Sequence, residues 1–340
     1  MDLNINYEDV SVKCSPNDYD FTSFIQDKLF RDQTFLEKIP FEGHYDFLNY
    51  DSSELKSDAS VVTRRRGEKF TKEVIESGST VTKNFYRYTM MIPISHGLSQ
   101  GQILPAGVHV RLTFHRANAR KALVDISNSV IEFGSFSIPL LEPMFHGCWS
   151  YGPKLDSQMG KVRTSGITIP FESAHIRHRV LEDGLLEHRI EIIQGPMPEY
   201  LVFFLMEPER FASDFKLSST KMQMHELDEF SLILDNVVQE GYPLKVIKRG
   251  KTKFYHEFYR RWLMETESYG DSDQKIMDEK TYIGYNFMIV ENFRNFESNE
   301  GNLAVKLKFE TVLSEKLFLA WMPCSKKELK FDRNMSVQMI

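Results

Sequence analysis

The stretch Glu199-Tyr-Leu-Val-Phe-Phe-Leu-Met206 decides how the rest of this chain is interpreted. It is a short, almost unbroken apolar run, rich in aromatic and branched side chains, with Pro196 and Pro198 before it and Pro208 behind it. A run of this length between prolines is typical of a fully buried β-strand rather than of a helix. After a long polar segment, Phe230-Ser-Leu-Ile-Leu234 predicts a second strand. Two strands joined across a long connection are typical of Greek-key sandwiches.

Length and composition fit a folded protein with room for two domains. The chain has 340 residues, of which 41% are apolar and 13% aromatic, and this is enough to build sizeable cores. Its formal net charge of −6 excludes a globally basic nucleic-acid binder but leaves room for a local basic patch. No apolar run reaches the length of a membrane span, and the beginning, Met1-Asp2, lacks the basic and then apolar layout of a signal peptide. We therefore expect no membrane contact.

The cysteines indicate the compartment of folding. Cys14, Cys148 and Cys324 are odd in number and far apart in the chain. This pattern argues against a disulfide framework and against a zinc site. We expect the protein to fold in a reducing interior.

Residues 1–128 carry few strand signals. Gly107-Val-His-Val-Arg-Leu-Thr-Phe-His115 alternates apolar and polar side chains strictly, as a half-exposed strand of an antiparallel sheet does. The spacing of Phe21, Phe24 and Ile25 predicts a short amphipathic helix. Residues 42–78 have the composition of a long polar loop. The other predicted strands of this part are Asp9–Lys13, Phe85–Ile94 and Ala122–Ile126.

A longer and more regular series of strands begins at Ser129. Asp183-Gly184 is a hairpin signal between two of them. Phe254, Phe258 and Trp262 recur at every fourth position and predict a helix, Lys253 to Thr266, whose aromatic face packs on the sandwich. About eight strands with an inserted helix are expected of a jelly roll. The predicted strands are Val130–Ile138, Ile176–Leu181, Leu185–Ile193, Tyr200–Met206, Phe230–Leu234, Tyr282–Val290, Leu303–Phe309 and Leu317–Trp321, the last extending toward Phe331.

An ordered series of short patterns in this later part resembles a known family. The patterns are Met197-Pro-Glu-Tyr-Leu-Val-Phe-Phe204, Phe230-Ser-Leu-Ile-Leu-Asp-Asn236, Pro243-Leu-Lys245, Phe258-Tyr-Arg-Arg-Trp-Leu263, Tyr285-Asn-Phe287, Gly301-Asn-Leu-Ala-Val-Lys-Leu-Lys-Phe309 and Phe331-Asp-Arg-Asn334. In this order they resemble the carboxyl-terminal part of the major capsid proteins of Polinton (Maverick) elements and adintovirus-like viruses. The resemblance weakens upstream of Lys83.

The resemblance implies a shell-building protein with two jelly rolls that stand side by side. Three copies would form a pseudo-hexagonal capsomer of an icosahedral shell, so it implies a homotrimer that contacts neighbouring capsomers, belongs to the virion capsid and folds in the nucleus or cytoplasm of the host cell. The expected fold class is mostly β, with antiparallel jelly-roll sandwiches and short inserted helices. We expect a partial jelly roll over residues 1–128 and a complete one over residues 129–340.

The first jelly roll is expected to be incomplete. Residues 1–128 offer roughly three or four strands, whereas a closed jelly roll needs about eight. Aligned by the resemblance, Val10-Ser-Val12 and the helix at Phe21 match the middle of the family's first domain. The family's opening strands then have no counterpart here, which implies either that they are encoded upstream or that the protein is a decayed or repurposed relic.

One basic segment is a candidate interface. The run from Lys245 to Lys253 contains no acid, and its five positive charges lie on Lys245, Lys248, Arg249, Lys251 and Lys253. In a capsid protein such a run is suited to non-specific contact with packaged DNA, because phosphate contacts need only charge and reach. It precedes a predicted helix, where the helix dipole least favours positive charge, so helix stability does not explain it. The alternative is a solvated loop between a strand and that helix.

The potential catalytic groups are scattered along the chain. His175 and His178 flank a predicted strand, and His225 is followed by Glu226 and Asp228. A cupin-like metal enzyme needs two histidines two positions apart with a carboxylate and a third histidine, and the sequence has no His-x-His. It also has no Gly-x-Ser-x-Gly elbow and no Gly-rich phosphate loop. We expect no catalytic residue, no metal ligand and no cofactor.

A ligand-binding or carbohydrate-binding β-sandwich is the alternative function. Trp149, Tyr151 and Tyr269 lie in expected loops, where aromatic rings are suited to form a platform for a sugar. The same rings are equally suited to contact a neighbouring subunit. The fold alone does not decide between these functions.

Overall fold

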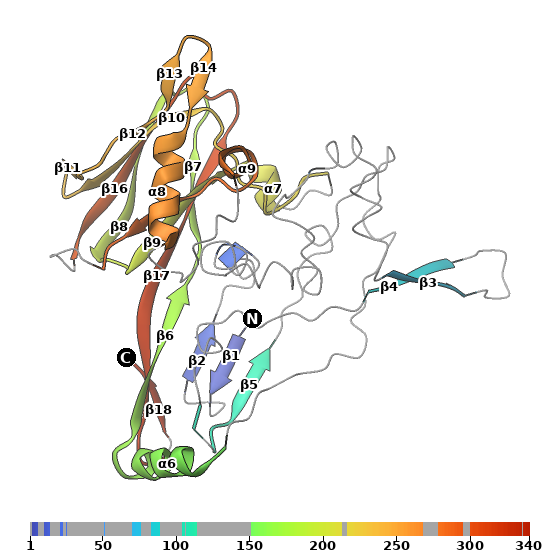
Figure 1. The fold of residues 1–340 in the computed structure, drawn as a ribbon, viewed down its shortest axis with the longest axis vertical. Helices are drawn as coiled ribbons and strands as arrows, with labels where there is room; N and C mark the ends of the chain where they lie inside the picture. Colours follow the sequence, from blue (N-terminus) through green and yellow to red (C-terminus); the bar gives the residue numbers. More distant parts are fainter. Residues whose placement is uncertain are drawn as a thin grey trace.

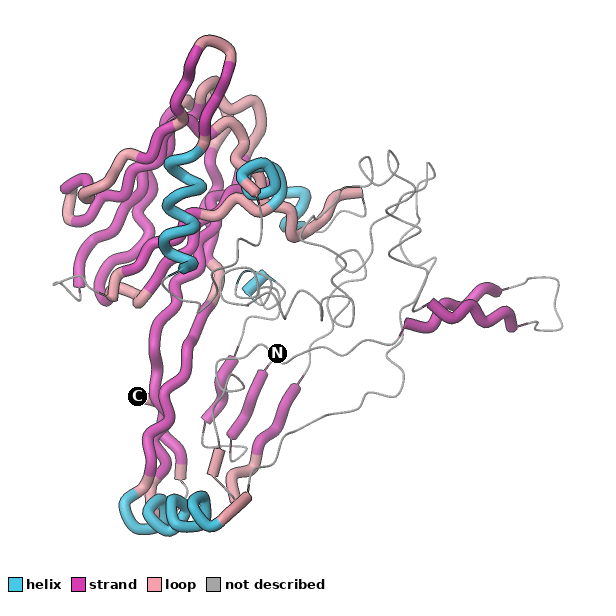
Figure 2. The backbone as a smooth tube through the Cα atoms, in the orientation of Figure 1, coloured by secondary structure: helices cyan, strands magenta, loops and turns pink. Residues whose placement is uncertain are grey.

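The computed structural model describes residues 2–5, 10–13, 21, 22, 25, 51, 70–75, 83–88, 104, 105, 107–113, 151–212, 216–267, 278–294, 300–334 and 336–340. Within these ranges the chain is mostly β, and its strand pairs are antiparallel. Figures 1 and 2 show a large sandwich from which one long strand pair runs down to a small helix.

The sandwich consists of two sheets with four strand positions each, counting two short edge strands as one position. The first sheet has the order β7 (Arg177–Leu181), β17 (Leu317–Phe331), β9 (Tyr200–Met206) and β15 (Ile289–Asn292). The second has the order β8 (Glu187–Pro196), β16 (Glu300–Phe309) and β10 (Leu227–Leu234), with β11 (Val237–Val238) and β12 (Leu244–Lys245) on the last edge. Successive strands cross from sheet to sheet, except that β11 and β12 stay beside β10, and the first and last of the series, β7 and β17, are neighbours. This is the strand order of a jelly roll.

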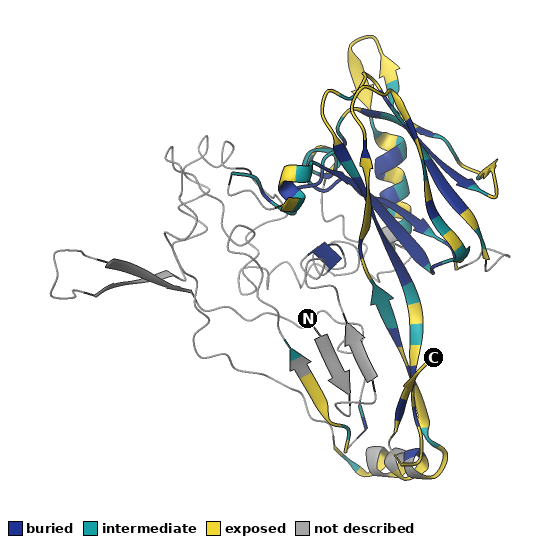
Figure 3. Ribbon diagram, turned by 180° about the vertical axis from the view of Figure 1, so that it is seen from behind, coloured by how far each residue is buried: buried dark blue, intermediate teal, exposed yellow. Residues whose placement is uncertain are grey.

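The core lies between the two sheets and is built from the apolar runs. Every residue of β9 is buried, as expected for a continuous apolar strand at the centre of its sheet. Phe203 of β9 and Phe230 of β10 meet across the sheets, with ring centroids 5.3 Å apart. Burial of each such ring contributes about 1.5–3 kcal/mol. Figure 3 shows buried residues concentrated along the central strands of both sheets.

Two helices cover the edge of the first sheet at β15. In α8 (His256–Glu267), Phe258 and Trp262 are buried, and the Trp262 ring lies 5.4 Å from that of Tyr282 in α9 (Glu279–Tyr285). Asp278 caps α9, because its side chain accepts a hydrogen bond from the backbone N–H of Thr281 at 2.7 Å. No helix in the described ranges is long and apolar enough to cross a membrane.

An arm continues from the sandwich along β17. The lower half of β17 pairs with β6 (Ile167–Ala174) and, at its end, with β18 (Val337–Met339). The helix α6 (Pro153–Ser165) lies at the lower end of the arm (Figure 1). The arm has a small core of its own, formed by Ile169, Phe171, Leu329, Phe331 and Val337, against which Leu104 and Val108 pack. Gly166, at the end of α6, has φ of 75°, and a Cβ there would lie 2.4 Å from the carbonyl oxygen of Phe331. Only glycine fits this turn.

Shorter elements complete the described part of the chain. β1 (Asp2–Ile5), β2 (Val10–Lys13) and β5 (Val110–Thr113) form a sheet in the order β2-β1-β5. β3 (Phe70–Ile75) pairs with β4 (Lys83–Tyr88). On the sandwich, α7 (Pro208–Ala212) follows β9, and β13 (Ile247–Arg249) pairs with β14 (Thr252–Phe254).

The mostly β, antiparallel sandwich predicted from the sequence is confirmed. Strands are found where the sequence predicts them around Tyr200–Met206, Phe230–Leu234 and Leu303–Phe309, and β17 does extend to Phe331. Phe21 and Ile25 are helical, as their spacing predicts. The predicted strands Val130–Ile138 and Ala122–Ile126 lie outside the described residues, and the division into domains at residue 128 stays a prediction.

Some predictions of local structure are wrong. Asp183-Gly184 does form a turn, but the turn joins β7 and β8, which belong to opposite sheets, so it is not a hairpin. The N–H of Gly184 donates to the carbonyl of Leu313 in the β16–β17 loop. The predicted strand Tyr282–Val290 is divided between α9 and β15, because the Asp278 cap starts a helix there.

The helix Lys253 to Thr266 begins later than predicted, and a further helix was missed. Phe254 belongs to β14 and is 39% exposed, so only Phe258 and Trp262 of the predicted aromatic face pack on the sandwich. The segment before Gly166, which has no clear period in the sequence, contains α6. α6 has few apolar residues and no clearly apolar face, so the spacing of apolar residues in the sequence did not predict it.

Candidate functional site

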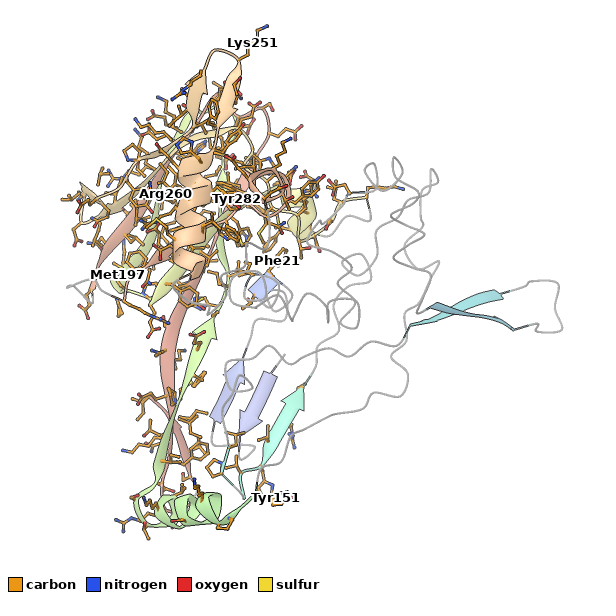
Figure 4. All side chains as sticks on the ribbon, in the orientation of Figure 1. Phe21, Tyr151, Met197, Lys251, Arg260 and Tyr282 are labelled. Carbon is orange, nitrogen blue, oxygen red and sulfur yellow. The ribbon has the colours of Figure 1, made fainter. Side chains whose placement is uncertain are left out.

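The predicted basic segment forms a β-hairpin that projects from one end of the sandwich. β13 pairs with β14, and Figure 4 shows Lys251 at the tip. Lys248 Nζ lies 2.8 Å from Asp228 Oδ1 and 3.6 Å from Glu310 Oε1, and Lys253 also pairs with Glu310. Hydrogen bonds to these carboxylates are the main cause that raises the pKa of Lys248 and of Lys253.

Little uncompensated charge remains on this hairpin. Lys245 Nζ lies 3.2 Å from Glu229 Oε2, and the guanidinium of Arg249 lies 5.8 Å from the ring centroid of Phe254. Among the described residues, Arg249 and Lys251 are the members of the segment without an ion pair. The fold thus supplies acids that the sequence places far from the basic run. DNA contact by this segment stays a prediction.

The histidines that the sequence offers for catalysis do not converge. His175 accepts a hydrogen bond from Arg177 Nε at 3.0 Å. The ring of His178 packs near Phe211 and Phe318, at centroid distances of 4.7 and 4.8 Å. Within the described ranges, no three His, Cys, Asp or Glu side chains gather in a way that could hold a metal ion.

The most extensive polar site is a buried ion cluster that the sequence did not reveal, here called the Asp51 cluster. Arg210 of α7 holds the Asp51 carboxylate with two hydrogen bonds, Nη1 to Oδ1 at 2.6 Å and Nη2 to Oδ2 at 2.8 Å. The N–H of Ser218 also donates to Oδ1 at 2.8 Å, and Lys221 Nζ donates to Oδ2 at 3.1 Å. On its other side, Arg210 Nε donates to Glu207 at 2.5 Å.

Among the described residues of the Asp51 cluster, two carboxylates face one guanidinium and one ammonium group. Burial acts to raise the pKa of Asp51, but the hydrogen bonds from Arg210 and Ser218 and the charges of Arg210 and Lys221 hold that pKa below its ordinary value. Removing one partner of such a pair is costly, because the other charge remains buried without compensation.

His225 borders the Asp51 cluster without adding charge to it. Its Nε2 lies 3.7 Å from Glu207 Oε2. Burial is the main cause that lowers the pKa of His225; the charge of Glu207 opposes this, whereas Arg210 and Lys221 act in the same direction. The ring is therefore neutral at neutral pH.

Aromatic contacts beside the cluster join the same parts of the chain. Phe21 and Ile25 are completely buried, and the Phe21 ring stacks on Phe211 of α7 with centroids 5.4 Å apart and planes 9° apart. Phe211 in turn meets Phe318 of β17 edge-on at 5.6 Å. Figure 4 shows Phe21 beside the lower end of the sandwich. These residues and Asp51 form a joint between early residues of the chain and the jelly roll.

A second ionic cluster, the Glu291 cluster, fixes α8 to the edge strand β15. Arg261 donates to Glu291 through Nη2 at 2.6 Å and Nε at 3.2 Å, and the hydroxyl of Tyr242 also donates to Glu291. Arg261 Nε lies 3.6 Å from Glu265 Oε1, so two carboxylates share one guanidinium. Burial raises the pKa of Glu291 and that of Glu265; for Glu265 the charge of Arg261 acts in the opposite direction.

Of the three aromatic residues expected to form a sugar-binding platform, Tyr151 lies in the described part of the chain. Tyr151, just before α6, is 93% exposed (Figure 4). Trp149 and Tyr269 lie outside the described residues.

Comparisons with known proteins find likeness in structures alone. No protein-family model matches the chain, and no curated protein matches it. PBCV-1 VP54, as fitted into a cryo-EM reconstruction of the virophage Sputnik, is 8% identical over 54% of this chain and 53% of that chain, with a TM-score of 0.33. A chain of the PBCV-1 virus capsid is 8% identical over 54% of both chains, with a TM-score of 0.32. The mavirus major capsid protein is 9% identical over 51% of this chain and 41% of that chain, with a TM-score of 0.31.

The aligned part spans about half the length of the PBCV-1 chains and less than half of the mavirus protein. The assignment of a jelly roll rests on the strand order of this chain itself.

Proposed function

We propose that this chain is a structural subunit of an icosahedral capsid, and not an enzyme. The observation that carries the proposal is where the resembling patterns fall. Met197–Phe204 covers most of β9, Phe230–Asn236 covers the second part of β10 and the turn after it, and Gly301–Phe309 covers all but the first residue of β16. These strands lie inside both sheets, and their order in the sheets is that of a jelly roll. The resemblance therefore concerns the framework of the fold rather than one loop.

The proposed assembly is a homotrimer that forms a pseudo-hexagonal capsomer and contacts neighbouring capsomers. The joint supports it, because docking of Phe21, Ile25 and Asp51 on the jelly roll is what two domains side by side in one chain require. A threefold arrangement uses a heterologous contact that closes on itself. Exposed apolar side chains are available for it where the β7–β8 and β16–β17 loops meet, with Leu185 51% and Val312 53% exposed.

The finer parts of the proposal follow from the family resemblance. They are an origin in a Polinton or adintovirus-like element and a place in the virion capsid after folding in the host nucleus or cytoplasm. Non-specific contact with packaged DNA belongs to the same proposal, with Arg249 and Lys251 as the uncompensated cations of the basic hairpin.

Electron microscopy of the purified full chain tests the proposal, with sedimentation velocity on the same sample. We expect threefold-symmetric capsomers or shells. A variant that places charges in the exposed loops, Leu185→Glu with Val312→Glu, should shift the sample toward monomer, whereas Glu182→Gln in the same loop should not. A wild-type monomer that binds sugars on a glycan array would replace the capsid role with the carbohydrate-binding alternative.

A further inference from the structure

The two strands β6 and β7 act as one long strand along β17. Ala174 stands opposite Cys324 and Arg177 stands opposite Trp321, so both strands keep the same alignment with β17. The interruption between them falls where β17 carries Pro323, which has no N–H. Side chains that alternate along this ribbon therefore share one face from the arm into the sandwich.

Four basic side chains lie on one face of this ribbon. His175, Arg177 and Arg179 are two residues apart and therefore point to the same side. Lys327 of β17 pairs directly with Phe171, which shares their alternation, so Lys327 lies on that side too. We call His175, Arg177, Arg179 and Lys327 the basic strip.

No acid compensates the basic strip within the described part of the chain. Neither Arg177, Arg179 nor Lys327 has an ion pair there, and the polar contact of Arg177 is with His175. Arg177 and Arg179 are exposed, and Lys327 is half-buried. Burial lowers the pKa of His175, and the charges of Arg177 and Lys327 act in the same direction. His175 is thus a neutral acceptor that orients Arg177.

The opposite face of the ribbon shows what compensation looks like. Lys326, next in the chain to Lys327, points the other way and lies 3.1 Å from Glu199. Arg294 lies 3.1 Å from Glu199 and 4.0 Å from Glu172 on the same side. Lys326 and Arg294 are thus each compensated by an acid on this face, whereas Arg177, Arg179 and Lys327 have no ion pair among the described residues.

We propose that the basic strip binds the phosphate backbone of a nucleic acid. Successive positions on one face of a strand are about 6.6 Å apart, so Arg177 and Arg179 present two guanidinium groups in a line. A guanidinium matches phosphate oxygens with two parallel hydrogen bonds. The strip presents exposed charge in a line along one strand, which suits sequence-independent contact with a phosphate backbone. The proposal concerns the surface of a single chain and does not depend on shell assembly.

The test measures binding of the purified full chain to a fluorescein-labelled duplex DNA of random sequence by fluorescence anisotropy over a series of salt concentrations. The variant R177Q/R179Q removes two cations that lack an ion pair. R260Q/K280Q is the matched control, because it removes two exposed cations from α8 and α9, which lie at the other edge of the first sheet. We expect R177Q/R179Q to weaken binding at least about tenfold at low salt and to lower the slope of log K against log salt by about 2. R260Q/K280Q should bind as the wild type does, and R177K/R179K should restore the slope.

Several outcomes would overturn the proposal. They are absence of DNA binding by the wild type, an equal or greater loss in R260Q/K280Q, or tighter binding of polyglutamate than of DNA, which would make the strip a site for an acidic polypeptide. Equal urea midpoints show that the variants fold; if the double variant does not, R179Q alone should lower the slope by about 1. Sedimentation of the same samples separates this proposal from the proposed assembly, because trimers without DNA binding would overturn the binding of DNA by the strip and leave the assembly standing.

Discussion

The Asp51 cluster and the Glu291 cluster are both ionic and both buried against the same jelly roll, yet they hold their elements differently. At the Asp51 cluster, two acids and two bases are matched, and Arg210 alone contacts both carboxylates. At the Glu291 cluster, two acids share Arg261, and the helix above is also held by the buried rings of Phe258 and Trp262. In the first, charge pairing carries the connection; in the second, it orients an element that aromatic packing already holds.

The difference also shows in the pKa values. Compensation holds the pKa of Asp51 below its ordinary value, whereas burial raises that of Glu291. Protonation of Asp51 in acid therefore costs stability, whereas protonation of Glu291 does not.

The largest effect expected is that of Trp262→Ala in α8. Trp262 is 2% exposed and packs against Tyr259 and Tyr282, so its truncation leaves a cavity. We expect a loss of about 3 to 5 kcal/mol in the free energy of unfolding, measured by urea titration. Met264→Ala on the exposed side of α8 is the control and should cost little. A loss below about 1 kcal/mol for Trp262→Ala would contradict the view that packing holds this helix.

Arg210→Met and Arg261→Met compare the two clusters directly. Arg210→Met removes both guanidinium hydrogen bonds from the buried Asp51, and we expect a cost of about 3 kcal/mol. The side chain of Arg261 is 28% exposed, and Arg261→Met should cost about 1 kcal/mol because Tyr242 still donates to Glu291. Hydrogen exchange should also show faster exchange in α7 for the first variant. Equal costs would remove the distinction between the clusters.

Asp51→Asn and Glu291→Gln test the opposite pKa directions. The lowered pKa of Asp51 stabilises the fold above the ordinary carboxyl pKa of about 3.9, and this contribution is lost as pH falls through the folded value. Asp51→Asn should therefore cost about 1–3 kcal/mol at neutral pH and progressively less in acid. Glu291→Gln should cost less than about 1 kcal/mol at neutral pH or stabilise the protein, because a charge penalised by burial is removed. Urea midpoints over a pH series check both, and a pH-independent cost for Asp51→Asn would sink the assignment.

The strands of the jelly roll were predictable because the local sequence pattern of each strand indicates that it is buried. β9 is a continuous apolar run between prolines. β16, and the part of β17 that lies in the sandwich, also consist largely of apolar residues. The turn at Asp235-Asn236 could be read from its residue types, and both have positive φ. The start of α9 had a signal as well, since Asp278 is a good N-cap, but the apolar residues after it indicated a strand.

The functional surfaces could not be predicted in the same way, because they depend on residues that are distant in the sequence. Asp51 and Arg210 are 159 positions apart, so no local pattern links them. The five cations of residues 245–253 lie close together in the sequence. Three of them, Lys245, Lys248 and Lys253, pair with Glu229, Asp228 and Glu310 in the fold. The basic strip differs from this segment, because its members are distant in the sequence and come together only in the fold. They form one surface through the alignment of β6 and β7 on β17.

The continuity of β17 has a mechanical consequence. Its upper half lies between β7 and β9, and its lower half is the backbone of the arm, so one strand reaches from the end of the arm to the middle of a sheet. A pull along the arm then loads the hydrogen bonds on both sides of the upper half in shear, all at the same time. Peeling an edge strand would break such bonds one after another. A force applied to the arm is therefore resisted by all the hydrogen bonds that join the upper half of β17 to β7 and β9, and the arm is anchored in the core of the sandwich.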